Sequence, residues 1–120
     1  MPSETSKSTA TWSITNEWGE GTAESPKFYQ VKIDIENHDG PIEQWKISFS
    51  VPKGIIPEKI NNWSASSTEV ENNRVYFTCH SWNGNIADGG VLGLEFQLAF
   101  EGNAEFFVKD IVINNKLIVE

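Results

Sequence analysis

Residues 91–100 read Val-Leu-Gly-Leu-Glu-Phe-Gln-Leu-Ala-Phe, with an apolar side chain at every second position from Leu92 onward. Because successive side chains of an extended chain point to opposite faces, this period predicts a β-strand with one face buried. Further runs alternate in the same way: 31–36, 45–51 and 75–79. A shorter first strand is predicted around Trp12 and Ile14, and a closing strand or hairpin over 111–113 and 117–119.

The segments between these runs are rich in turn-forming residues. They are 37–41, 52–54, 72–73 and 88–90. Many short strands with frequent turns predict an all-β fold, an antiparallel β-sandwich of immunoglobulin-like or jelly-roll-like type. The 120 residues suit one domain. We expect a polar linker or disordered arm over 1–10, which is rich in Ser and Thr, and the sandwich over 11–120.

Charge excludes several classes of partner. The chain carries 9 basic and 17 acidic residues, a formal net charge of −8, and the basic ones are scattered. Phosphate binding needs clustered Lys and Arg, so neither nucleic acid nor an anionic membrane is an expected partner. No apolar run is long enough to span a bilayer. Cys79 is the only cysteine, and no cofactor or metal motif stands out. A monomer is expected.

The 5 tryptophans fall into two groups. Trp45 is in phase with the apolar positions of its run and is predicted to lie in the core, and Trp12 to be buried or half-buried. Trp18, Trp63 and Trp82 instead stand among polar and turn-forming residues, with Ala as the one apolar type within two positions. These three are predicted to be exposed, and together they would form an apolar patch of the kind that marks a binding site.

A sugar ring is the ligand that suits such a patch. The axial C–H groups of a pyranose form an apolar face that stacks on an indole. Polar side chains at the rim then bond the equatorial hydroxyls, and Asn16, Asn62, Asn83 and Asn85 stand beside the three tryptophans. These seven residues form the predicted ligand-binding site.

The order of these motifs resembles the family 2 carbohydrate-binding modules. The matching stretches are Asn16-Glu17-Trp18-Gly19-Glu20-Gly21, Gln44-Trp45-Lys46-Ile47-Ser48-Phe49 with Pro52, Asn62-Trp63-Ser64-Ala65, and Trp82-Asn83-Gly84-Asn85-Ile86-Ala87-Asp88-Gly89. The resemblance implies a non-catalytic module of a larger secreted protein, attached to a glycoside hydrolase or scaffold. It implies a planar strip of Trp18, Trp63 and Trp82 that binds cellulose first, then other β-glucans, mannan or xylan. Xylan-binding relatives carry Arg where Gly21 stands, which favours the cellulose type.

Competing functions have less support in the residues. Glycoside hydrolysis needs two carboxylates across a cleft, and no motif frames such a pair, so we expect no enzyme. A calcium site from Asp34, Asp39, Asp88 or Asp110 matches no known loop spacing. The remaining alternative is a protein-interaction or spacer module of an extracellular scaffold or adhesin, since sandwiches serve many functions.

Overall fold

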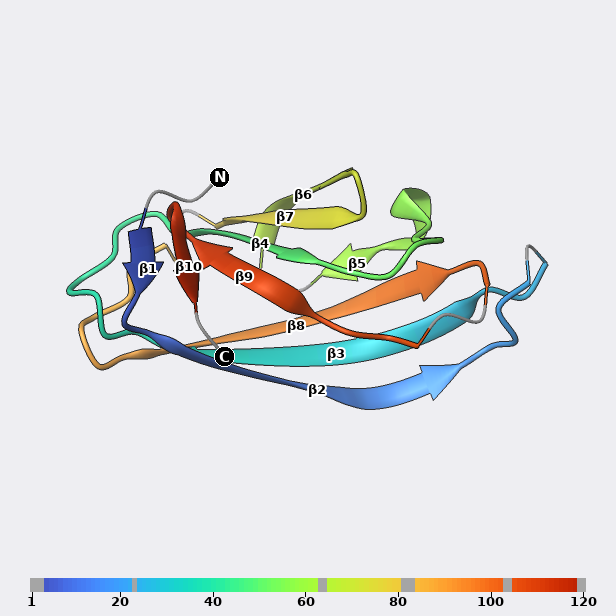
Figure 1. Cartoon of the computed structure of the whole chain (residues 1–120), viewed down its shortest axis with the longest axis horizontal. Coiled ribbons are helices and arrows are strands. Elements are labelled where there is room, and N and C mark those ends of the chain that lie inside the picture. The colour runs from blue at the N-terminus through green and yellow to red at the C-terminus, as the bar shows by residue number, and fades with distance from the viewer. Residues whose placement is uncertain (1–3, 23, 63–64, 81–83, 103–104, 119–120) are drawn as a thin grey trace.

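The computed structural model places two β-sheets face to face (Figure 1). It describes residues 4–22, 24–62, 65–80, 84–102 and 105–118. The four-stranded sheet has the order β2-β3-β8-β5, and the six-stranded sheet has the order β1-β10-β9-β4-β7-β6. This confirms the predicted all-β sandwich. The pairs are antiparallel except that β1 runs parallel to β10.

The bounds of the elements follow the predicted alternation in the core strands. The elements are β1 Glu4–Ser6, β2 Thr9–Trp18, β3 Lys27–Glu36, β4 Lys46–Ser50, the 3-10 helix η1 Pro57–Lys59, β5 Asn61–Asn62, β6 Ala65–Glu71, β7 Arg74–Cys79, β8 Val91–Phe100, β9 Lys109–Ile113 and β10 Lys116–Ile118. The predicted closing hairpin is confirmed by β9 and β10. Within the described residues, no helix reaches the length and apolarity that a membrane crossing requires.

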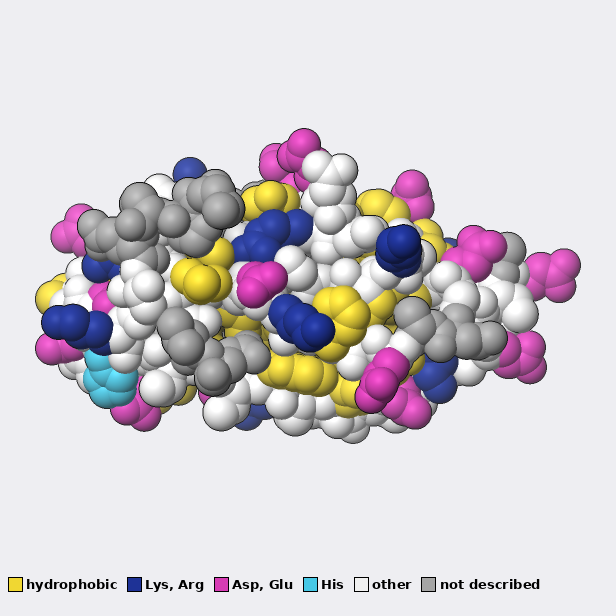
Figure 2. Space-filling model, viewed as in Figure 1, with side chains coloured by type: hydrophobic (Ala, Val, Ile, Leu, Met, Phe, Trp, Pro, Cys, Tyr) yellow, Lys and Arg dark blue, Asp and Glu magenta, His cyan; other side chains and the backbone are white. Residues whose placement is uncertain are grey.

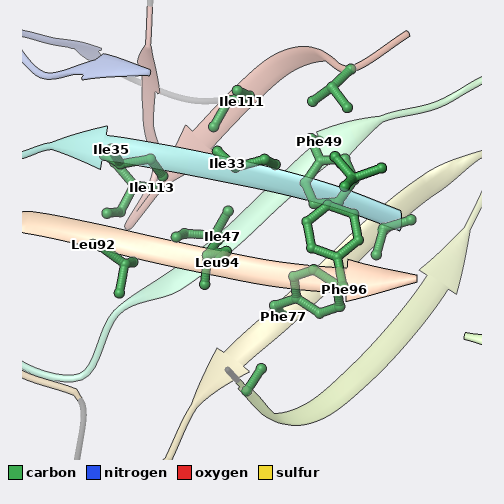
Figure 3. Packing of buried hydrophobic residues seen from close by; sticks show 14 of the residues in the cluster. Ile33, Ile35, Ile47, Phe49, Phe77, Leu92, Leu94, Phe96, Ile111 and Ile113 are labelled. Atoms are coloured by element: carbon green, nitrogen blue, oxygen red, sulfur yellow. The ribbon is translucent and has the colours of Figure 1, made fainter. Parts of the chain in front are cut away.

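The core fills the space between the two sheets. Phe49 of β4 and Phe77 of β7 meet Phe96 of β8 from the opposite sheet, with ring centroids 5.0–5.7 Å apart. Figure 3 shows these rings together, with Ile47 and Leu94 packed farther along the same strands. Trp45 is 0% exposed, as predicted, and Trp12 is half-buried and packs edge-on against Phe106. Large side chains from both sheets therefore interlock across one continuous core.

The N-terminal segment differs from the arm predicted over 1–10, because β1 pairs with β10 and β2 already begins at Thr9. The carboxylate of Asp39 holds this segment. It accepts hydrogen bonds from the hydroxyl of Ser6, the backbone N–H of Lys7 (2.8 Å) and the hydroxyl of Ser8 (2.9 Å). Both serines are buried, so this part is fastened by polar contacts and lacks the apolar alternation that would predict a strand.

β6 is a second strand without a sequence signal. It is an outer strand of the six-stranded sheet, and most of its side chains are exposed or half-buried. An edge strand that contributes little to the core needs no apolar period. Sequence periodicity therefore located the strands that build the core and missed β1, β5 and β6, which contribute little to it.

Candidate functional site

A β-bulge in β2 decides which side chains reach the outer face of the four-stranded sheet. Trp12 pairs with Ile33 and Ile14 pairs with Val31. Ile33 and Val31 are fully buried, so this phase of the strand pair faces the core. The register then shifts between Ile14 and Asn16, so that Asn16 pairs with Gln30 and Trp18 with Phe28. One extra residue, Thr15, thus moves the following side chains to the opposite face. Without it, Trp18 would point into the sandwich in phase with Trp12.

Trp18 stands at the last position of β2 and is 39% exposed. Its indole stacks on the ring of Phe28, its partner on β3, with centroids 5.3 Å apart and planes 5° from parallel. Gly19 follows with φ +95°, and a Cβ there would lie 1.9 Å from the carbonyl oxygen of Pro26. Glycine is therefore required where the chain turns away directly after the exposed tryptophan.

A row of four side-chain amides crosses the same outer face. Asn16 pairs with Gln30, Gln30 with Gln97, and Gln97 with Asn61, so the row spans β2, β3, β8 and β5. With strands about 4.8 Å apart, this amide row is about 14 Å long. Asn16 accepts the N–H of Glu17 (3.0 Å), whereas Gln30, Gln97 and Asn61 make no side-chain hydrogen bond within the described part of the chain. These amides are available to sugar hydroxyls, as donors and acceptors.

The other predicted residues are spread along the sandwich. Asn62 uses its side chain locally, accepting the N–H of Ala65 (2.9 Å) and donating to the hydroxyl of Thr68 (2.6 Å). Asn85 is exposed, beside the bridge between Ile42 and Ile86. Trp63, Trp82 and Asn83 lie outside the described residues. Of the predicted set, the structure brings Asn16 and Trp18 together on one face.

Asn85 and Trp18 lie toward opposite ends of the four-stranded sheet. Phe28, the partner of Trp18, pairs with Ala99 near the end of β8, whereas Asn85 precedes Val91, where β8 begins. The nine residues from Val91 to Ala99, eight steps along the strand, span about 26 Å at the usual strand rise. The structure therefore separates Asn85 from Trp18 along the sandwich.

The surface around the amide row carries charges of both signs. On the outer face of β3, the Nζ of Lys32 lies 3.9 Å from the Oδ1 of Asp34 in an exposed ion pair. The Nζ of Lys27 lies 3.6 Å from the Oε1 of Glu17. Figure 2 shows the same pattern over one side of the molecule, with Lys and Arg standing singly among acidic side chains. Burial, and then the charge of Glu17, raise the pKa of Tyr29. The described residues contain no group of His, Cys, Asp and Glu suited to a metal ion.

The amide row and Trp18 lie on an open face. One hollow, about 570 Å³, lies beyond the end of β8, where Ile56, Glu101 and Gly102 are among its lining residues. Two more, of about 490 and 660 Å³, lie around Tyr76 on the six-stranded sheet. None of these three includes Trp18 or the amide row. Such an open face suits a large, flat ligand better than a small molecule enclosed in a pocket.

A family model described as "Cellulose binding domain", family 2 of the carbohydrate-binding modules, matches residues 8–114. The chain belongs to this family. It is therefore a carbohydrate-binding module, and the resemblance seen in the sequence is confirmed. A search of curated proteins finds no match.

Solved structures resemble the module over most of its length. Chitinase ChiA74 from Bacillus thuringiensis is 29% identical with a TM-score of 0.60; the match covers 88% of the module and 15% of that chain. The chitin-binding domain of Chi18aC from Streptomyces coelicolor is 18% identical with a TM-score of 0.64, covering 92% and 93% of the two chains. The cellulose-binding family 2 domain of ScLPMO10C is 18% identical with a TM-score of 0.58, covering 88% and 96%. The last two show the shared fold.

Sequence reasoning missed Phe28 and most of the amide row. Gln30 and Gln97 occupy polar positions of alternating strands, which predicts only that they face away from the core. That they meet across neighbouring strands is a matter of register. The sequence signal that could have found them is the presence of amide side chains at positions predicted to face outward.

Proposed function

We propose that the module is a non-catalytic domain that binds flat β-1,4-linked polysaccharide, cellulose first, on the outer face of its four-stranded sheet. Trp18, Trp63 and Trp82 stack on pyranose rings, and the amide row bonds the hydroxyls around them. The supporting observation is the bulge, which sets an exposed Trp18 on the same face as the amide row. An enzyme would need a pair of acid–base groups across a cleft, whereas the proposed site consists of indole rings and side-chain amides.

The chemistry of this face matches the chemistry of the ligand. Equatorial hydroxyls give a β-linked glucan a polar edge, while its axial C–H groups form apolar faces. An indole covers the apolar face and removes it from water, and side-chain amides both donate to and accept from the hydroxyls. Since a neutral glucan forms no ion pair with the protein, its affinity should depend little on salt.

The size of the face favours a polymer over a short sugar. The amide row spans about 14 Å across the strands, and β8 extends about 26 Å from Val91 to Ala99, the residue level with Phe28 and Trp18. Xylan, mannan and other β-glucans share the extended shape and are the next ligands to test.

The parent protein is proposed to be secreted and to carry a glycoside hydrolase or scaffold segment. The module corresponds to 15% of the chitinase chain that it matches at 29% identity. A module of this size, attached to a catalytic domain, would hold that domain at an insoluble substrate and raise its local concentration.

Chitin is the second candidate ligand, because the relative at 29% identity is a chitinase. Chitin presents the same axial C–H face as cellulose. Its acetamido group adds an amide that can pair with the amide row, since amides both donate and accept. The two polymers therefore compete for the same proposed surface.

Sedimentation with insoluble cellulose, chitin, xylan and mannan tests the proposal. The wild-type module should bind cellulose most tightly, and Trp18→Ala and the double variant Trp63→Ala/Trp82→Ala should bind less while remaining folded. Tyr76→Ala is the matched control, because Tyr76 is 38% exposed on the other sheet. Stronger binding to chitin would reverse the order of the two polymers. Failure to bind any polysaccharide would favour a protein-interaction or spacer module.

A further inference from the structure

Phe28 is a half-buried aromatic that the core does not use. Phe28 and Tyr29 are consecutive residues of β3, so their side chains point to opposite faces of the sheet. Tyr29 packs against Phe100 and Phe106 inside the sandwich. The ring of Phe28 instead lies on the outer face, and its aromatic contact in the described part of the chain is with Trp18. A large apolar side chain at an outward position needs a reason other than core packing.

The contact covers one side of the indole. The rings are within 5° of parallel with centroids 5.3 Å apart, an offset stack. Phe28 therefore occupies part of one face of Trp18. Trp18 nevertheless remains 39% exposed, so part of the indole is left for a sugar ring.

The position of Trp18 explains why it needs such support. β2 is an outer strand of its sheet, Trp18 is its last residue, and Gly19 follows at once. An exposed indole at a strand end would sample several rotamers and lose that freedom on binding. β3 lies between β2 and β8, so Phe28 stands on a better anchored strand.

We propose that Phe28 is a positioning residue that orders the Trp18 indole before the polysaccharide binds and leaves it one face for stacking. This inference rests on the proposed function and identifies a determinant of affinity at the same site. Phe28 acts through Trp18 and has no ligand contact of its own. Removing it should weaken binding by about 2–10-fold, the cost of ordering one free side chain.

A double-mutant cycle on immobilised or insoluble cellulose tests this role. Phe28→Ala should weaken binding in the wild-type background and have no further effect in a Trp18→Ala background, because its effect passes through Trp18. Phe28→Tyr should keep wild-type affinity, since it keeps a flat ring. Phe28→Leu should fall between, since it restores apolar volume without stacking. Additive losses, or equal affinity of Phe28→Ala and wild type, would overturn the proposal.

A spectroscopic measurement separates positioning from folding. In a ¹H–¹⁵N spectrum each tryptophan contributes one indole N–H signal, and Trp18→Phe assigns the signal of Trp18. Phe28→Ala should shift this signal, by removing the ring current of Phe28, and leave that of buried Trp45 in place. If the wild type binds no polysaccharide, the proposed function fails and the positioning role with it. If it binds and the Trp18 signal does not move in Phe28→Ala, the positioning role alone fails.

Discussion

Replacing Trp18 by alanine should weaken polysaccharide binding without unfolding the module. Trp18 keeps 39% of its surface exposed. A tryptophan buries at most about 250 Å², so about 100 Å² is left for a ligand. At about 25 cal/mol per Å² this corresponds to about 2.5 kcal/mol if a sugar covers it fully, and about 1 kcal/mol if coverage is less than half. The expected loss of affinity is therefore about 5–70-fold.

The cost to folding should be smaller, because Trp18 lies outside the core. The lost stack with Phe28 is worth about 0.5–1.5 kcal/mol. Binding isotherms on microcrystalline cellulose and urea unfolding, measured on the same preparations, separate the two effects. Tyr76→Ala removes a ring of similar exposure from the other sheet and should bind within twofold of wild type. If Trp18→Ala binds as tightly as wild type, the outer face of the four-stranded sheet is not the binding surface.

Three further changes probe the core, the bulge and the N-terminal segment. Trp45→Ala should lower the free energy of unfolding by about 3–5 kcal/mol, since this side chain is 0% exposed; a loss below 1 kcal/mol in urea would contradict its core position. Deleting Thr15 should remove the bulge and turn Trp18 toward the core, so the variant should lose cellulose binding at least as fully as Trp18→Ala; retained binding would show that the bulge does not set the face. Burial alone would raise the pKa of Asp39, but hydrogen bonds from Ser6, Lys7 and Ser8 lower it overall, so its stabilisation is present above the ordinary carboxyl pKa and is lost as the pH falls through the lowered one. Asp39→Ala should therefore cost about 1–2 kcal/mol at neutral pH, and chemical unfolding should show this difference shrinking below about pH 4; a constant difference would exclude the carboxylate as its source.

The fold class and the core could be predicted from the sequence because burial on a strand has a local signature. Alternation placed Trp45, Phe77 and Phe96 inside, and each is nearly or fully buried. The motifs around the tryptophans also sufficed to indicate the family, which the match over residues 8–114 confirms. Both inferences use neighbours along the chain, and neither requires knowledge of which strands pair.

Local patterns in the chain suffice to predict a β-sandwich with a core Trp45 and a set of tryptophans in polar surroundings. Strand pairing is needed to know which face Trp18 occupies, because the bulge at Thr15 reverses the phase that alternation with Trp12 would predict. Pairing also brings Asn16, Gln30, Gln97 and Asn61 into one row and Phe28 against Trp18. Register between strands depends on pairing between distant segments, and a shift of one residue moves every following side chain to the other face.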